Sequence, residues 1–175
     1  MSPNTKGIEA ISMNRTRKLM TASMLTALTC LATMVIKIPS PLQGYLNLGD
    51  CVVLCCGWVL GPVYGFWAAG VGSGLADLLS GYALYAPATF LIKGAMAAAA
   101  WVIWHKLESK SGSRLLSGVC AELLMIRGYL AFESVLYGFG PALVNVPANG
   151  MQGLAGLILG VLLAKNLREH RLMAL

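Results

Sequence analysis

The run from residue 51 to residue 76 contains no charged side chain. Uncharged runs of this length are typical of lipid-embedded helices, because about 20 apolar residues are needed to cross a bilayer. Charged residues make up only 11% of the chain, against about 25% in a typical soluble domain. We therefore predict an integral membrane protein, and we exclude a soluble enzyme, a nucleic-acid-binding domain and a disordered chain.

The chain has room for about six helical spans and short loops. Gly61 and Pro62 divide the uncharged run into two helices, since proline is favoured in the first turn of a helix. The predicted spans are residues 19–36, 51–60, 62–79, 87–104, 115–137 and 148–164. The predicted fold class is therefore all-α: a polytopic protein with a six-helix membrane domain over residues 18–165, flanked by tails over residues 1–17 and 166–175.

Basic residues gather in three clusters, which lie before the first span, between the fourth and fifth spans, and after the last. Clusters of Lys and Arg mark cytoplasmic loops. One topology places all three inside, with both termini in the cytoplasm. The loops 37–48, 80–86 and 138–147 then face outward, and their prolines and glycines predict irregular structure.

No catalytic motif is present: the sequence has no GxSxG, no HExxH and no P-loop. The five cysteines include no CxxC pair, which favours neither a disulfide framework nor a zinc site. We expect no catalytic residue, no metal, no cofactor and no enzymatic activity. Any work driven by ATP would require another subunit.

Polar side chains converge in the outer half of the predicted bundle. At about 1.5 Å per residue, Lys93 and Glu133 lie roughly 7–9 Å below the outer ends of their spans. Ionisable residues at such depth are functional candidates. Asp77, Asn149 and Gln152 fall at the same level, which predicts a polar pocket open to the outside. Nearby tyrosines offer flat surfaces for stacking: Tyr45, Tyr82, Tyr85 and Tyr129.

Structural roles for these polar residues remain open alternatives. Lys93 and Glu133 could form an ion pair that serves packing only. Asp50 could cap the second helix and Asn149 the sixth, while Asp77 could pair with a neighbouring helix. Under this reading the chain is a small membrane scaffold or assembly protein.

The first helix carries a stripe of small side chains: Ala22, Ser23, Thr26 and Ala27. Small residues allow helix backbones to approach closely in a membrane. The stripe therefore predicts a contact surface, either for a helix of this chain or for another subunit.

Four segments resemble the substrate-binding S components of energy-coupling factor (ECF) transporters. They are residues 44–50 followed by 60–62, residues 72–94, the pair 128–129 with Glu133, and residues 149–153. The run 72–94 is the most specific, and the resemblance covers about residues 18–165. The closest subset is the riboflavin/hydroxymethylpyrimidine/pyridoxine type.

That resemblance implies a six-helix subunit of the bacterial plasma membrane that captures a vitamin or vitamin precursor. A pyrimidine or pyridine ligand is the first expectation and riboflavin the second. The implied partners are a transmembrane coupling subunit, docked on Ala22, Ser23, Thr26 and Ala27, and two cytoplasmic ATPases. The candidate substrate-binding residues are Asn47, Asp77, Tyr82, Tyr85, Thr89, Lys93, Tyr129, Glu133, Asn149 and Gln152.

Overall fold

A computed structural model describes residues 15–39, 45–107 and 112–169. The outer parts of both predicted tails, the middle of the first outer loop and part of the basic loop lie outside these residues. The described elements are α1 (Arg15–Val35), β1 (Ile38–Pro39), β2 (Tyr45–Leu46), α2 (Gly49–Leu60), α3 (Pro62–Leu79), α4 (Ala86–Lys106), α5 (Ser113–Tyr137) and α6 (Phe139–Glu169). The predicted all-α class is confirmed.

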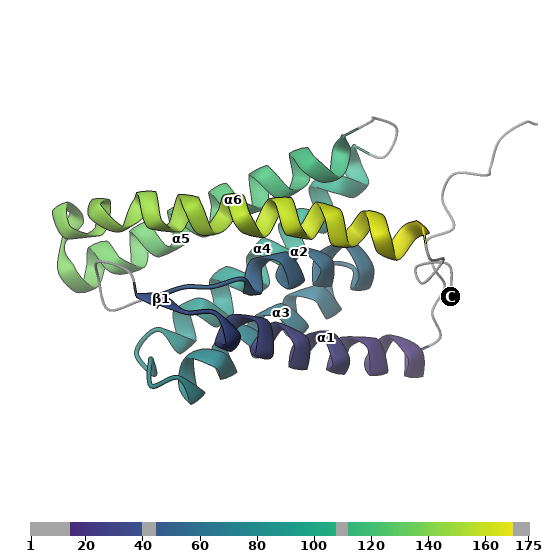
Figure 1. Cartoon of the computed structure of the whole chain (residues 1–175), viewed down its shortest axis with the longest axis horizontal. Helices are drawn as coiled ribbons and strands as arrows, with labels where there is room; N and C mark the ends of the chain where they lie inside the picture. The colour runs from purple at the N-terminus through teal and green to yellow at the C-terminus, as the bar shows by residue number, and fades with distance from the viewer. Residues whose placement is uncertain (1–14, 40–44, 108–111, 170–175) are drawn as a thin grey trace, which may run out of the picture.

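The helices form one bundle with two distinct ends (Figure 1). The start of α1, the end of α4, the start of α5 and the end of α6 lie at one end. At the other end lie β1 and the junction of α5 with α6. There β1 and β2 pair antiparallel, with Ile38 opposite Leu46. The described residues of the three basic clusters thus share one end of the bundle.

Helix α2 is the centre of the bundle. Every residue in it except Val59 is buried, and it packs against α1, α3, α4 and α6. Its 12 residues extend about 18 Å, which is less than the roughly 30 Å hydrocarbon core. By length and composition, α1, α4, α5 and α6 are the helices able to cross a membrane among the described residues.

The break between α2 and α3 falls where the sequence predicts it. Gly61 has φ +84° and its N–H donates to Gly57 O at 3.0 Å, which ends α2. Pro62 then opens α3 at a position where its missing N–H costs nothing.

Glycines let α3 pack closely against two neighbours. A Cβ atom on Gly70 would lie 2.7 Å from the carbonyl oxygen of Phe90 on α4. A Cβ atom on Gly72 would lie 2.6 Å from the carbonyl oxygen of Thr26 on α1. Such distances are below van der Waals contact, so side chains at these positions would force the helices apart.

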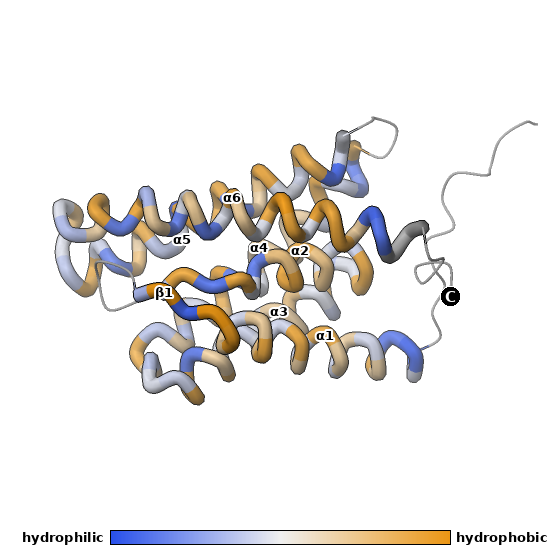
Figure 2. The backbone as a smooth tube through the Cα atoms, viewed as in Figure 1, coloured by the Kyte–Doolittle hydropathy of each residue, from blue (hydrophilic) through white to orange (hydrophobic). Residues whose placement is uncertain are grey.

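Large apolar side chains cover the outside of the bundle. Met24 and Leu28 on α1 and Leu154 and Ile158 on α6 are all exposed. Figure 2 shows α1 as hydrophilic at its start and mostly apolar or neutral beyond it. An apolar exterior around a bundle with buried polar groups is typical of a protein surrounded by lipid.

The predicted irregular loop 138–147 is wrong, because α6 begins at Phe139. Gly138, with φ +90°, ends α5 and reverses the chain within one residue. Pro141 lies in the first turn of α6, where proline is tolerated, and Pro147 lies inside the helix. Transmembrane helices accommodate an internal proline when neighbouring groups satisfy the freed backbone. Asn149 is therefore an interior residue of α6 and not its cap.

Candidate functional site

A pocket opens between the helices at the end that carries β1 and β2. About 490 Å³ of space lies between its side chains, including the part that is open to the surroundings. The lining residues are Thr33, Tyr45, Asn47, Ser73, Asp77, Tyr82, Tyr85, Thr89, Lys93, Tyr129, Glu133, Asn145, Asn149 and Gln152. Every candidate substrate-binding residue named from the sequence is among them.

One side of the pocket is built by β2 and α3. The Tyr45 hydroxyl donates to Asp77 Oδ1 at 2.7 Å, and Asp77 is 5% exposed. Burial, together with the neighbouring Asp77 carboxyl, raises the pKa of Tyr45, so this phenol stays a neutral donor. Its ring packs against Tyr82 with centroids 4.7 Å apart. These contacts fix the β2 segment against α3 beside the opening.

The floor of the pocket is a buried ion pair. Lys93 Nζ bonds Asp50 Oδ1, and both side chains are almost fully buried. Gln152 Nε2 donates to the other Asp50 oxygen at 2.7 Å, and the Asn47 N–H donates to Gln152 Oε1 at 3.1 Å. Lys93 thus pairs with Asp50 and not with Glu133, and Asp50 makes no cap hydrogen bond at α2.

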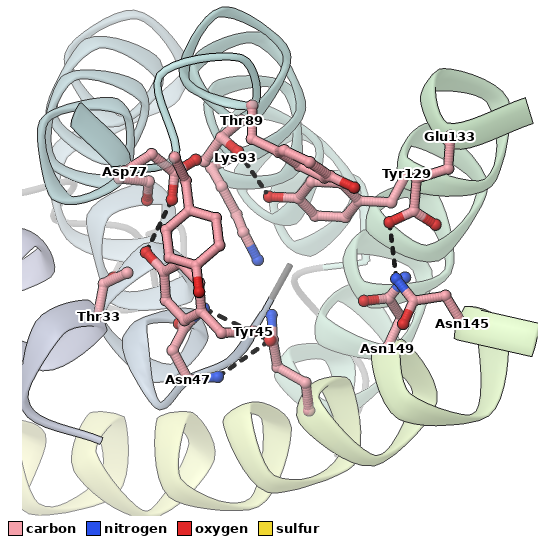
Figure 3. Close-up of a pocket in the computed structure, with 14 residues that line it drawn as sticks. Thr33, Tyr45, Asn47, Asp77, Thr89, Lys93, Tyr129, Glu133, Asn145 and Asn149 are labelled. Carbon is pink, nitrogen blue, oxygen red and sulfur yellow. Dashed lines mark hydrogen bonds between the residues drawn. The ribbon is translucent and has the colours of Figure 1, made fainter. Parts of the chain in front are cut away.

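The opposite side comes from α4, α5 and α6. Asn145 Nδ2 donates to Glu133 Oε1 at 2.6 Å, and Thr89 Oγ1 lies 3.1 Å from the Tyr129 hydroxyl. Lys93 Nζ sits 5.5 Å from the centre of the Tyr129 ring. Figure 3 shows Tyr129, Glu133 and Asn145 facing Asp77 and Tyr45 across the pocket.

Several buried polar atoms of the lining make no hydrogen bond of good geometry with the described residues. They are Thr33 Oγ1, Ser73 Oγ, Asp77 Oδ2, Tyr85 OH, Glu133 Oε2, Asn145 Oδ1 and Asn149 Nδ2. An unsatisfied buried polar group costs about 1–3 kcal/mol. A polar ligand that pairs with several of them would recover that free energy.

Sequence reasoning missed three lining residues. Asn145 was assigned to a loop, although its spacing to Asn149 and Gln152 repeats every three to four residues, as on one face of a helix. Ser73 lies four residues before Asp77 and so shares its face of α3. Thr33 gave no signal beyond being a polar residue in an apolar span.

The small residues on α1 divide between two faces. Ala22 and Thr26 are half-buried, and Ala22 packs against the core. Ser23 and Ala27 are exposed. The Ser23 and Thr26 hydroxyls donate to carbonyl oxygens one turn earlier in α1. Part of the stripe thus packs within this chain, and part lies on the surface.

Glu122 lies below the pocket and does not line it. It is 5% exposed, and neither carboxyl oxygen has a hydrogen-bond partner within the described part of the chain. A Cβ on Gly153 would lie 3.0 Å from Glu122 Oε2, so α5 and α6 meet here with little space between them.

Comparisons with known proteins agree with this architecture. Residues 13–169 match the profile of the family described as "ECF-type riboflavin transporter, S component". An uncharacterized protein of Pyrococcus woesei is 38% identical over 130 residues, which cover 73% of this chain and 86% of that protein.

A solved structure is similar along nearly its whole length. It is described in a study of the structure and mechanism of the S component of a bacterial ECF transporter. The TM-score is 0.74 at 25% identity, and the match covers 89% of this chain and 97% of the other. S components are substrate-binding subunits of transporters and not enzymes, and the apolar helices make this a multi-pass membrane protein. The chain therefore belongs to the family of ECF-type riboflavin transporter S components.

Proposed function

We propose that this chain captures riboflavin, or a closely related vitamin, on the outer side of the plasma membrane. The observation that carries the proposal is the pocket, where unpartnered polar atoms and tyrosine rings meet inside an apolar bundle. The family description supports riboflavin as the first candidate. The sequence alone favoured a smaller pyrimidine or pyridine ligand.

A pyrimidine or pyridine vitamin precursor is the second candidate. Asp77, Glu133 and the amides of Asn145 and Asn149 would accept from or donate to ring hydroxyl and amino substituents. The Tyr45 and Tyr82 rings pack together with their centroids 4.7 Å apart, and both line the pocket, so a small aromatic ring could stack on them.

A direct binding measurement separates the two candidates. The purified protein would be titrated with riboflavin, with hydroxymethylpyrimidine and with pyridoxine, and its thermal stability followed. A bound ligand raises the midpoint of unfolding, since it stabilises only the folded state. If none of the three compounds raises the midpoint of unfolding, the result would favour the alternative that the chain is a membrane scaffold.

Orientation follows from charge, and we infer that both termini are cytoplasmic. The pocket then opens outward. A membrane-impermeant thiol reagent applied to intact cells should label Ala83→Cys, which is exposed beside the pocket end. Lys106→Cys, exposed at the other end, should stay unlabelled, and the parent protein gives the background of the native cysteines. Labelling of Lys106→Cys from outside would reverse the orientation.

Transport requires partners under this proposal. The sequence has no nucleotide-binding motif, so release to the inside would depend on a transmembrane coupling subunit and two ATPases. Cells that carry the chain with this coupling module should concentrate the vitamin, and cells that carry the chain alone should only bind it. Concentrative uptake by the chain alone would contradict the assignment.

A further inference from the structure

Arg127 is a cation on the outer surface of a helix that is able to cross the membrane. It lies on α5, and its side chain is exposed. Within the described part of the chain, no hydrogen bond, ion pair or ring contact joins it to another residue. Charged residues inside membrane spans almost always face the interior of a bundle or pair with one another. Arg127 does neither within the described chain, so its partner is expected outside it.

The depth of Arg127 makes a lipid headgroup a poor partner. Arg127 is the fifteenth of the 25 residues of α5, which places it about 3 Å from the midpoint of the helix. If α5 is centred in a hydrocarbon core of about 30 Å, the nearer edge is about 12 Å away. An extended arginine side chain is shorter than that distance. The Cα–Cβ bond of a helical residue also tilts toward the N-terminus, so this side chain starts away from the nearer edge.

The surface around Arg127 is an apolar groove, which we call the α5 groove. Leu116 and Leu123 are exposed on the same face of α5. With Cys120 between them, these residues and Arg127 follow at steps of four, three and four residues, which is the spacing of a seam between two packed helices. The residues that line the groove are Cys120, Leu123, Leu124, Arg127 and Gly128.

A second copy of this chain offers no charge that matches Arg127. Away from the basic end, the acidic residues of the described helices are Asp50, Asp77, Glu122 and Glu133, and each is at most 5% exposed. A symmetric dimer through this face would instead bring two Arg127 side chains together, because the same patch is used by both copies. Like charges at an interface are unfavourable.

The α5 groove lies away from the surface of α1. Helix α5 packs against α4 and α6, whereas α1 packs against α2 and α3. Figure 1 shows α1 along one side of the bundle and α5 with α6 along the other. A helix bound in the α5 groove would therefore leave the exposed small residues of α1 free for a different partner.

We propose that the α5 groove binds a transmembrane helix of a different protein, and that this helix places a carboxylate beside Arg127. The apolar walls of the groove pack against the apolar face of the incoming helix. The carboxylate accepts two charge-assisted hydrogen bonds from the guanidinium group, which removes the cost of a cation that faces lipid. The inference goes beyond the proposed function and does not rest on it, since no residue of the groove lines the vitamin pocket.

Synthetic transmembrane peptides test this chemistry. One probe is a leucine-rich peptide of about 20 residues, long enough to span the bilayer, with a single glutamate at its centre. The matched probe carries glutamine there. The full-length protein and one peptide would be reconstituted in phosphatidylcholine vesicles, with energy transfer between a dye on each as the readout. We expect the glutamate peptide to associate at least about fivefold more tightly, because hydrogen bonds between charged groups are the stronger ones.

Variants of the protein assign the effect to Arg127. Arg127→Gln removes the charge and should abolish the preference for the glutamate peptide, whereas Arg127→Lys should keep part of it. Lys106→Gln is the matched control, since it removes a positive charge from an exposed position outside the groove, and it should keep the wild-type preference.

The melting temperature without peptide separates docking from a structural role. Arg127→Gln removes a cation that has no partner in the described chain, so the melting temperature in the same vesicles should stay unchanged or rise. A clear drop would show that Arg127 stabilises the fold of this chain, which would overturn the inference.

The other occupants give different results. If phosphatidylglycerol stabilises the wild-type protein but not Arg127→Gln against heat, the groove binds a lipid headgroup. If energy transfer between two labelled copies of the protein is lost in Arg127→Gln, the groove binds a second copy. Either result would overturn the inference, as would equal association of the wild-type protein with both peptides. None of these results bears on vitamin binding, so the proposed function would stand.

Discussion

At the end of the bundle away from the pocket, the helices meet backbone to backbone. A Cβ on Gly57 would lie 2.2 Å from the carbonyl oxygen of Ala97, and one on Gly65 would lie 2.8 Å from that of Cys56. At the pocket end the helices are joined instead by hydrogen bonds between polar side chains, such as Asp50, Lys93 and Gln152.

The two ends of the bundle contribute differently to stability and to binding. Close packing gains dispersion energy and leaves no space for a ligand. Polar packing leaves buried donors and acceptors without a well-formed hydrogen bond to the described residues, which lowers stability until a ligand binds. We infer that the tightly packed end supplies the stability on which the incompletely satisfied pocket depends.

The largest effect is expected from breaking the ion pair at the floor of the pocket. Lys93→Met leaves the Asp50 carboxylate buried and unpaired, which should cost about 3–5 kcal/mol of unfolding free energy. Heat-induced unfolding in detergent measures the loss. The double variant Lys93→Met, Asp50→Asn should recover part of it, because the Asp50 charge that lost its partner is then removed as well. A double variant no more stable than Lys93→Met would contradict the pairing.

A smaller loss should follow from one added methyl group at the tightly packed end. Gly57→Ala places a Cβ against the Ala97 backbone, which cannot move without separating α2 from α4, so we expect about 1–3 kcal/mol of destabilisation. Gly150→Ala is the control, since nothing lies within 4 Å of its Cβ position. Alanine at position 150 should leave the melting temperature unchanged or raise it slightly. Equal stability of the two variants would mean that α2 and α4 are not closely packed.

At the pocket end, a substitution should affect binding without affecting folding. Asn149 Nδ2 has no partner in the described chain, so Asn149→Ala should change the melting temperature little. The loss of one ligand hydrogen bond should weaken riboflavin binding about tenfold, or about 1.4 kcal/mol. Met151→Ala, two residues along and 70% exposed, should bind normally. Normal binding by Asn149→Ala would place the ligand elsewhere.

The smallest effect on the isolated protein is expected on the surface of α1. Ala27 is exposed, so Ala27→Trp should leave folding and ligand binding unchanged and weaken co-purification with the coupling subunit. Ala22 packs on the core, so Ala22→Trp should lower the melting temperature. Undiminished co-purification of Ala27→Trp would show that this face of α1 is not the docking surface.

Sequence reasoning succeeded where a local property decides structure. The uncharged run predicted two apolar helices, and Gly61 with Pro62 predicted the break between them, because proline geometry acts within one turn. The same local rule failed at Pro147, where it predicted a loop. Residues 139–147 continue α6 because the surrounding helices stabilise it, which no local preference reports.

Hydrophobicity and helical depth by themselves determined that this chain forms a membrane bundle and that Asp77, Lys93, Glu133, Asn149 and Gln152 lie at one level. Depth along a helix follows from a fixed rise per residue, so it is readable from sequence. The rotation of each helix about its axis and the choice of side-chain partner cannot be read from the sequence in this way. Only the tertiary structure decided that Lys93 pairs with Asp50 and that Glu133 accepts from Asn145, because both depend on how separate helices pack in three dimensions.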